Sequence, residues 1–267
     1  NKKINSTQFN VVEKFDNLNI TKNSDSNVSS FLTIQEGCNK FCKFCVVPYT
    51  RGPEFSRSID ELINETLNLV KNGTREINLL GQNVNSYSYN GKRLSHLIEE
   101  ISKIDKIKRI RYTTSHPIDF SEDLIEAHKK VSKLMPLIHL PVQSGSNKIL
   151  KKMNRKHSIK YYLDLIKKLK LVNSRIEFSS DFIIGYPGET DQDFLNTIKL
   201  LKEIEYINTY SFIFSPRPGT PAAKMKKIDD YVSKERLFSF QKLAHEIKMK
   251  YRKNLLNKKS IVMFENS

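Results

Sequence analysis

The sequence predicts an α/β protein built as an open, partial β/α barrel of six units. Short apolar runs alternate with amphipathic stretches along the chain, which is typical of strands and helices that follow one another. Strands separated by helices run parallel, because each helical crossover returns the next strand in the same direction. Polar loops follow the apolar runs, as they do at the functional rim of α/β barrels. A doubly wound open sheet is the alternative that the same pattern permits.

The composition is that of an ordered globular protein. The chain has 267 residues, of which 38% are hydrophobic, with nine glycines and nine prolines, and this length is sufficient for a large core. Collagen-like and disordered proteins are therefore excluded. No apolar run reaches about 18 residues, and residues 1–16 lack the apolar segment of a secretory signal. We expect a cytoplasmic protein with no membrane partner.

Each element is predicted from local pattern. The apolar runs that predict strands are residues 31–34, 77–80, 110–113, 137–140, 178–184 and 207–214. A capping box at residues 58–61 begins the first helix, and Asn72 and Gly73 end it. The later amphipathic stretches are residues 94–103, 121–133, 158–171, 190–204 and a long basic helix at 233–256.

The ends of the chain differ in character from its middle. Residues 1–29 are rich in Asn, Ser, Lys and Asp, which predicts a linker that precedes the folded body. Residues 30–256 carry the alternating pattern and form the predicted core. An apolar run at 261–264 indicates the first strand of a further domain, which we place at 257–267.

The chain is strongly basic, with 45 Lys and Arg against 29 Asp and Glu and a formal charge of +16. A charge of this sign favours a polyanionic partner such as RNA, because binding to phosphates releases condensed counterions. A general bias of composition toward Lys, Asn and Ile explains the charge equally well. The same two explanations apply to the basic helix at 233–256, which combines a basic face with an apolar stripe.

The three cysteines, Cys38, Cys42 and Cys45, follow the first predicted strand with C-x3-C-x2-C spacing. An odd number within eight residues does not suit disulfides and indicates metal ligation in a reducing compartment. A structural zinc ion requires four ligands, so a distant histidine would have to complete that site. An iron–sulfur cubane held by three cysteines instead keeps one iron open for a substrate.

At this point the sequence resembles a known superfamily. The three cysteines, with Phe44 before the last one, look like the cluster-binding loop of radical S-adenosylmethionine (SAM) enzymes. The wider segments 35–52, 78–87 and 113–117 are similar to one branch, the MiaB-type tRNA methylthiotransferases, which add a methylthio group to C2 of an isopentenylated adenosine beside the anticodon. The resemblance extends from about residue 11 to the end of the chain.

The resemblance implies the cofactors and the reaction. A three-cysteine [4Fe–4S] cluster binds SAM at its open iron, an electron cleaves the SAM sulfur–carbon bond, and the resulting radical removes hydrogen from the substrate. The resemblance implies no catalytic side chain, because cluster and SAM carry the chemistry. It also implies a second [4Fe–4S] cluster in an N-terminal domain and a C-terminal TRAM-like RNA-binding domain in the full-length protein. This chain looks like an excised core, so we expect only one cluster here.

The resemblance also implies contacts with SAM. Those expected of this chain are Phe44, Gly81, Gln82, Gln143, Ser144, Arg155, Ile184 and Gly185. Gly81 and Gln82 would face the methionyl amino group, and Arg155 would bind the carboxylate. An ordinary turn at Gly81 and a surface charge at Arg155 are the structural alternatives. His116 and His139 are interpreted as structural histidines.

The expected partners are the anticodon stem-loop of a tRNA and a reducing electron donor. The alternatives are a sister methylthiotransferase acting on threonylcarbamoyl-adenosine in tRNA or on a ribosomal-protein aspartate, and a non-catalytic zinc-binding RNA module. The sister branches share the cysteine loop, whereas segments 81–87 and 113–117 favour the isopentenyl-adenosine branch.

Overall fold

The computed structural model describes residues 28–264. Most of the linker expected at 1–29, and the last three residues of the chain, lie outside this part. The described region begins at Val28, whose carbonyl accepts hydrogen bonds from the backbone N–H groups of Arg75 and Glu76.

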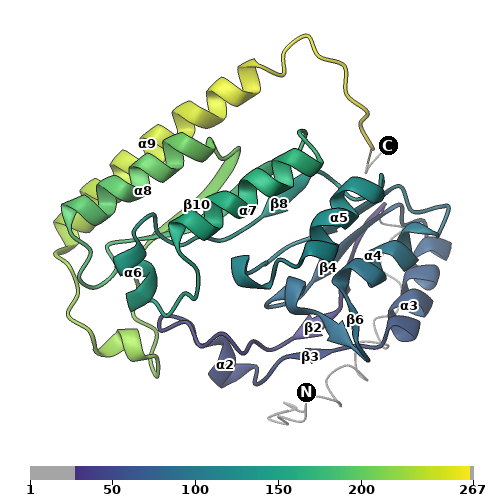
Figure 1. The fold of residues 1–267 in the computed structure, drawn as a ribbon, viewed down its shortest axis with the longest axis horizontal. Coiled ribbons are helices and arrows are strands. Elements are labelled where there is room, and N and C mark those ends of the chain that lie inside the picture. The colour runs from purple at the N-terminus through teal and green to yellow at the C-terminus, as the bar shows by residue number, and fades with distance from the viewer. Residues whose placement is uncertain (1–27, 265–267) are drawn as a thin grey trace, which may run out of the picture.

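Six parallel strands form two three-stranded sheets (Figure 1). The first sheet has the order β1 (Ser29–Thr33), β4 (Glu76–Leu80), β7 (Arg109–Tyr112). The second has the order β8 (Leu137–His139), β9 (Glu177–Ile184), β10 (Asn208–Ile213), with β9 in the middle. All the strand pairs within these two sheets are parallel, as the alternating pattern predicts.

A short bridge joins the two sheets. The Ile110 N–H donates to the Lys133 carbonyl at 2.8 Å, and the Met135 N–H donates to the Ile110 carbonyl at 3.0 Å. The strands therefore follow one another in space in chain order, without the reversal of a doubly wound sheet. In the described part of the chain, β1 and β10 do not pair with each other. The predicted open six-unit barrel is confirmed.

The helices connect successive strands and pack beside one another in a row (Figure 1). The long helices are α3 (Ile59–Lys71), α4 (Leu94–Ser102), α5 (Glu122–Lys130), α7 (Ile159–Val172), α8 (Asp191–Ile204) and α9 (Asp230–Lys253). The short helical elements are α2 (Val47–Thr50), α6 (Asn147–Lys152), η2 (Val84–Ser86), η3 (Pro117–Asp119) and η4 (Pro221–Lys224). Two small antiparallel pairs, β2 (Gln35–Glu36) with β3 (Phe55–Ser56) and β5 (Ser88–Tyr89) with β6 (Lys92–Arg93), lie in loops.

Side-chain caps fix where several helices begin. The Ser58 hydroxyl accepts from the Glu61 N–H, as the capping box predicts. Helix α8 has a reciprocal box between Thr190 and Asp193. Helix α9 begins at Asp230 and not at 233, because the Asp229 carboxylate accepts from two N–H groups of the first turn.

The main core lies between the strands and the helices, and it contains Leu32, Ile77, Ile110, Ile138 and Phe182, all 0% exposed. Residues 258–264 form neither helix nor strand, and Ile261 is 94% exposed. The strand predicted at 261–264 is therefore wrong for this structure, because no strand of the described part of the chain pairs with the segment. In residues 28–264, no helix has the length and apolar character needed to cross a membrane.

Candidate functional site

The cysteine loop follows the first strand of the barrel at residues 37–45. Cys42 is buried, at 7% exposure, whereas Cys38 and Cys45 are partly exposed, and none of the three forms a disulfide. The loop bends between the cysteines, where Phe41 has a φ of +47° and the Cys45 N–H donates to the Cys42 carbonyl at 2.9 Å. The three thiols thus belong to one short, folded segment.

Gly37 begins this loop and requires its glycine. Its φ is +76°, and a Cβ atom there would lie 2.0 Å from the Pro53 carbonyl oxygen. A side chain would therefore both strain the backbone and displace residue 53. The close approach lets the Cys38 N–H donate to the Gly52 carbonyl at 3.2 Å.

Polar side chains hold the start of the loop against the end of β4. The Gln82 Oε1 atom accepts from the Gly37 N–H at 2.6 Å. Gln35, fully buried, donates to the Gly37 carbonyl at 2.8 Å and accepts from the Asn83 N–H at 3.1 Å. Gly81 leaves room for this glutamine, because a Cβ there would lie 2.6 Å from Gln35 Oε1.

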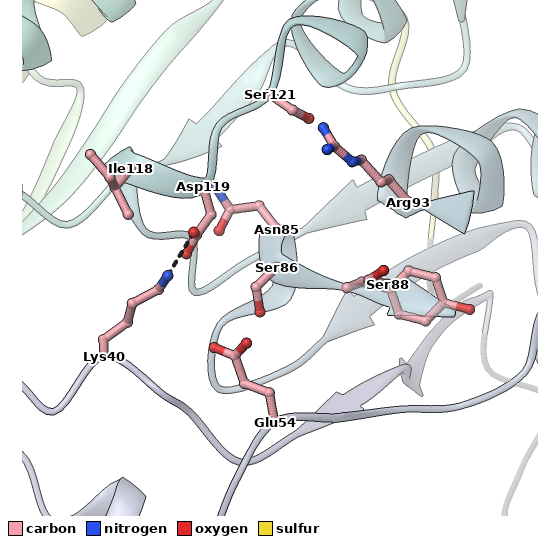
Figure 2. Close-up of a pocket in the computed structure, with 10 residues that line it drawn as sticks. Lys40, Glu54, Asn85, Ser86, Ser88, Arg93, Ile118, Asp119 and Ser121 are labelled. Carbon is pink, nitrogen blue, oxygen red and sulfur yellow. Dashed lines mark hydrogen bonds and ion pairs between the residues drawn. The ribbon is translucent and has the colours of Figure 1, made fainter. Parts of the chain in front are cut away.

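A second group of polar contacts ties the loop to η3 (Figure 2). The Lys40 ammonium pairs with Asp119 at 2.6 Å, and the other Asp119 oxygen accepts from the Asn83 amide at 2.8 Å. The same amide donates to Glu54 at 3.0 Å. Charged groups from three loops thereby fix one side of the cysteine loop.

These residues border an open polar pocket of about 530 Å³ (Figure 2). Its lysine pairs with Asp119, and Arg93 pairs with Asp123 at 3.4 Å, so both of its cations have carboxylate partners. None of the expected SAM contacts lines this pocket. We assign no ligand to it.

The thiols suit an iron–sulfur cluster by their chemistry. Burial raises the pKa of Cys38 to about 11 and also raises the pKa of Cys45, and the charges of the neighbouring cysteines add to both effects. Thiols of this kind ionise when a metal ion displaces their protons. No three His, Cys, Asp or Glu side chains of residues 28–264 are grouped to hold a single metal ion. In a cubane each thiolate binds a different iron, so three thiols in one loop fit this cofactor by their number and chemistry.

Arg155 comes from the turn after α6 and reaches the cysteine loop. Its Nη2 atom donates to the Pro141 carbonyl at 2.6 Å, and its Nη1 atom lies 3.7 Å from Cys42 Sγ. The residue is only 8% exposed, so it is not the surface charge that the sequence also permitted.

Two buried histidines lie beside this arginine, and their rings are 5.9 Å apart. Burial and the charge of Arg155 lower the pKa of His157 to about 3. The same causes lower the pKa of His116, whose Nδ1 accepts from the Ile118 N–H at 3.2 Å. His139 instead lies on the strands, 3.0 Å from the Ser179 hydroxyl and 3.3 Å from Asp181.

Gln143 and Ser144 follow β8, and both shape the turn there, Gln143 through its backbone and Ser144 through its hydroxyl. Gln143 has a φ of +76°, and its backbone pairs with Asp181 and Ile183 of β9, at 2.9 Å in each case. The Ser144 hydroxyl is buried beside Thr197, 3.5 Å away, and accepts from the Ser146 N–H at 3.2 Å. Ser144 therefore also shapes the turn after β8.

Gly185 follows β9 and is held by an ion pair. Its N–H donates to Glu189 Oε1 at 3.1 Å, and that oxygen also accepts from Arg236 of α9 at 2.8 Å. Arg236 pairs in addition with Asp191 at 2.6 Å. Burial raises the pKa of Glu189 despite the arginine. The turn after β9 thus depends on the last helix.

The structure separates the two apolar residues expected near the adenine. Phe44 packs in a small cluster with Tyr186, Met153 and the partly buried Ile183. Ile184 is 0% exposed and belongs to the main core. Because neighbouring strand residues point to opposite faces, Ile183 and not Ile184 shares a face with Phe44.

Sequence reasoning missed several residues that shape the site: Gln35, Asn83, Ile183, Glu189 and Arg236. The period-two pattern of β9 was a signal for Ile183. The ion pair of Arg236 with Glu189 and the amide contacts of Gln35 and Asn83 left no signal in the sequence, because their partners lie far apart along the chain.

Curated relatives resemble almost the whole chain. A Pelagibacter ubique protein named tRNA-2-methylthio-N(6)-dimethylallyladenosine synthase is 58% identical over 99% of this chain and 60% of its own length. A protein of the same name from the Wolbachia of Brugia malayi is 52% identical over 97% of this chain and 60% of its length. The chain thus spans about three fifths of these relatives.

Solved structures share the fold at low sequence identity. Escherichia coli coproporphyrinogen III oxidase, described as a radical SAM enzyme, matches with a TM-score of 0.61 and 15% identity over 83% of this chain and 53% of its own. The radical SAM methyltransferase TsrM of Kitasatospora setae matches with a TM-score of 0.61 and 15% identity, over 74% of this chain and 39% of its own length.

The family model that matches is the radical SAM superfamily, over residues 32–201. This range begins in β1, includes the cysteine loop and ends in α8. It therefore covers the end of β1, all of β4, β7, β8 and β9, and the turns after these strands. The chain belongs to the radical SAM superfamily.

Proposed function

We propose that this chain is the radical core of a tRNA methylthiotransferase that adds a methylthio group to C2 of isopentenyladenosine next to the anticodon. The observation that carries the proposal is the folded loop with all three cysteines of the chain, anchored to the turn after β4. The similarity to synthases of this name over almost the whole chain supports it.

Cys38, Cys42 and Cys45 would hold a [4Fe–4S] cluster with one open iron, as expected of a radical SAM protein. When bound, the cluster and SAM supply reductive cleavage of the SAM sulfur–carbon bond. The chain's own residues bind and orient the two cofactors and exclude water from them. No side chain is proposed as a catalytic acid or base.

Contacts with SAM are proposed for Gly81, Gln82, Gln143, Ser144 and Gly185, which lie in the turns after β4, β8 and β9. Arg155, in the turn after α6, is proposed to bind the SAM carboxylate. Phe44 and Ile183 offer an apolar surface for the adenine, because they pack in one cluster. Ile184 would support this surface from behind and not touch it.

The sulfur donor is proposed to lie outside this chain. All three cysteines belong to one loop, so a second thiolate-bound cluster would need cysteines from another segment. A longer protein, of which residues 1–29 would be a linker and 257–267 the start of a TRAM-like domain, would supply it. This division agrees with the span of about three fifths of the relatives.

The proposed partners are the anticodon stem-loop of a tRNA and an electron donor for the cluster, which would place the protein in the cytoplasm. The charge of +16 agrees with an RNA substrate. The names of the relatives favour isopentenylated adenosine over threonylcarbamoyl-adenosine or a ribosomal-protein aspartate.

A gene deletion tests the proposal. Nucleosides from the tRNA of a deletion strain should lose the methylthio group and retain the isopentenyl group, and the intact gene should restore it. A deletion strain with unchanged methylthio-isopentenyladenosine would contradict the proposal. Loss of the methylthio group from threonylcarbamoyl-adenosine instead would assign the chain to the sister reaction.

A further inference from the structure

Arg155 is a buried cation without a carboxylate partner among the described residues. Its two terminal nitrogens contact the Pro141 carbonyl and the Cys42 sulfur, and its Nε atom has no hydrogen-bond acceptor. The side chain has little access to water, since the residue is 8% exposed. A buried guanidinium is costly unless an anion compensates it.

Before any cofactor binds, the described side chains around Arg155 do not supply that anion. His116 and His157 stay uncharged at neutral pH, because burial and the arginine itself lower both pKa values. Lys40, which also influences His116, is a cation that pairs with Asp119. The nearest group that becomes anionic on metal binding is the Cys42 sulfur, 3.7 Å from Nη1.

We propose that Arg155 raises the reduction potential of the cluster bound through Cys42, by donating an N–H to the Cys42 sulfur and placing a positive charge beside it. Reduction adds one negative charge to the cluster, so a nearby cation and an N–H donor stabilise the reduced form. The inference rests on one part of the proposed function, namely that the three cysteines hold a [4Fe–4S] cluster. Arg155 is thus a tuning residue for electron transfer.

The Pro141 contact gives this role its geometry. A hydrogen bond of 2.6 Å to a backbone carbonyl holds one arm of the guanidinium. The planar fork then directs the other arm toward Cys42, which a flexible ammonium would not do. The position of the N–H donor is therefore set before any cofactor binds.

A redox titration of the reconstituted chain without SAM tests the proposal. Wild type and Arg155→Gln are reduced stepwise, and the reduced cluster is followed by electron paramagnetic resonance. We expect the ratio of reduced to oxidised cluster at a fixed potential to fall at least tenfold in Arg155→Gln, a change of about 59 mV for one electron.

Arg57→Gln is the matched control. Arg57 is equally buried, at 6% exposure, but it pairs with Glu65 at 2.7 Å and donates to the Thr33 carbonyl. Removing this arginine should leave the potential of the cluster unchanged. An equal shift in both variants would overturn the proposal, because general loosening of the protein would then explain it.

Arg155→Lys tests the effect of Arg155 on the reduction potential if the glutamine variant does not fold. Lysine keeps the charge but cannot contact Pro141 and Cys42 together, so the potential should lie measurably below wild type. A wild-type potential in this variant would overturn the proposal and leave Arg155 with the SAM carboxylate alone.

The titration also separates this proposal from the proposed function. It uses neither tRNA nor SAM, so a shifted potential would stand even if the chain modified no tRNA. If the wild-type chain bound zinc and no iron–sulfur cluster, both proposals would fall together.

Discussion

Gln82 and Gly37 lie 45 residues apart, and the Gln82 side chain accepts a hydrogen bond from the Gly37 N–H at 2.6 Å. Gly37 directly precedes Cys38, so this contact connects the turn after β4 to the start of the cysteine loop. Besides the contact with SAM proposed for it, Gln82 thus supports the loop that carries the cysteines.

Gln82→Leu should destabilise the loop. It leaves the Gly37 N–H without its acceptor, which we expect to cost about 1–3 kcal/mol of unfolding free energy and to lower the iron content after reconstitution. Urea denaturation of the metal-free protein measures the first effect. Gln82→Glu keeps an acceptor oxygen, so its unfolding free energy should fall much less. An equal fall in both variants would show that the hydrogen bond is not the cause.

Arg236→Met should destabilise the whole chain. Glu189, 5% exposed, would lose the cation that compensates its charge, at a cost of about 3–5 kcal/mol. Lys250→Met on the same helix is the control, because its pair with Glu205 is exposed and contributes about 1 kcal/mol at most. Similar denaturation midpoints for the two variants would contradict the importance of the buried pair.

His157→Phe should flatten the dependence of stability on pH. The pKa of His157 is about 3 in the folded chain, against about 6.5 when unfolded. The unfolded state therefore binds more protons in this range, and stability falls as the pH drops from about 6.5 toward 3. Urea denaturation from pH 7 to pH 4 should show a shallower loss in the variant. The same slope in both proteins would place His157 in contact with water.

Binding of a tRNA anticodon stem-loop should weaken steeply with salt. If the +16 charge forms phosphate contacts, six to ten of them would lower the affinity about 10³- to 10⁵-fold between 50 and 200 mM salt. Fluorescence anisotropy with a labelled stem-loop measures this slope. Affinity that does not change with salt would assign the charge to compositional bias.

Much of the fold was predictable because it depends on local pattern. Apolar runs of four to eight residues located β1, β4, β7, β8, β9 and β10. The Ser58 cap located the start of α3, since that hydrogen bond spans three residues. The cysteine spacing was equally local, and it indicated the loop that Gly37 begins.

The contacts between distant segments were not predictable. Arg236 and Glu189 are 47 residues apart, and Arg155 and Cys42 are 113 apart. Such pairs form only when the barrel brings its turns together, so no local pattern marks them. The bridge between Ile110 and Leu134, which joins the two sheets, was not predictable for the same reason. Leu134 is in addition an isolated bridge residue, and one residue is too short to show the pattern of a strand.

Each cysteine should be indispensable for the cluster. Cys38→Ala, Cys42→Ala and Cys45→Ala each remove one of three thiolates, which leaves an iron without a protein ligand. The iron and sulfide content after anaerobic reconstitution should fall from about four of each per chain to a small fraction. Lys43→Ala is the control, because Lys43 lies between two of the cysteines. Its backbone N–H donates to the Met153 carbonyl, and alanine keeps this contact, so the variant should retain the cluster.

Formation of 5′-deoxyadenosine by the reconstituted, reduced chain alone tests most directly whether its one cysteine loop supports radical chemistry without sulfur delivery. Mass spectrometry should detect 5′-deoxyadenosine with wild type and Lys43→Ala, and none with Cys42→Ala. The methylthio nucleoside should be absent when an isopentenylated tRNA is added, since the three cysteines of the chain all belong to that loop. Full SAM cleavage by Cys42→Ala, or catalytic methylthiolation by this chain alone, would contradict the assignment.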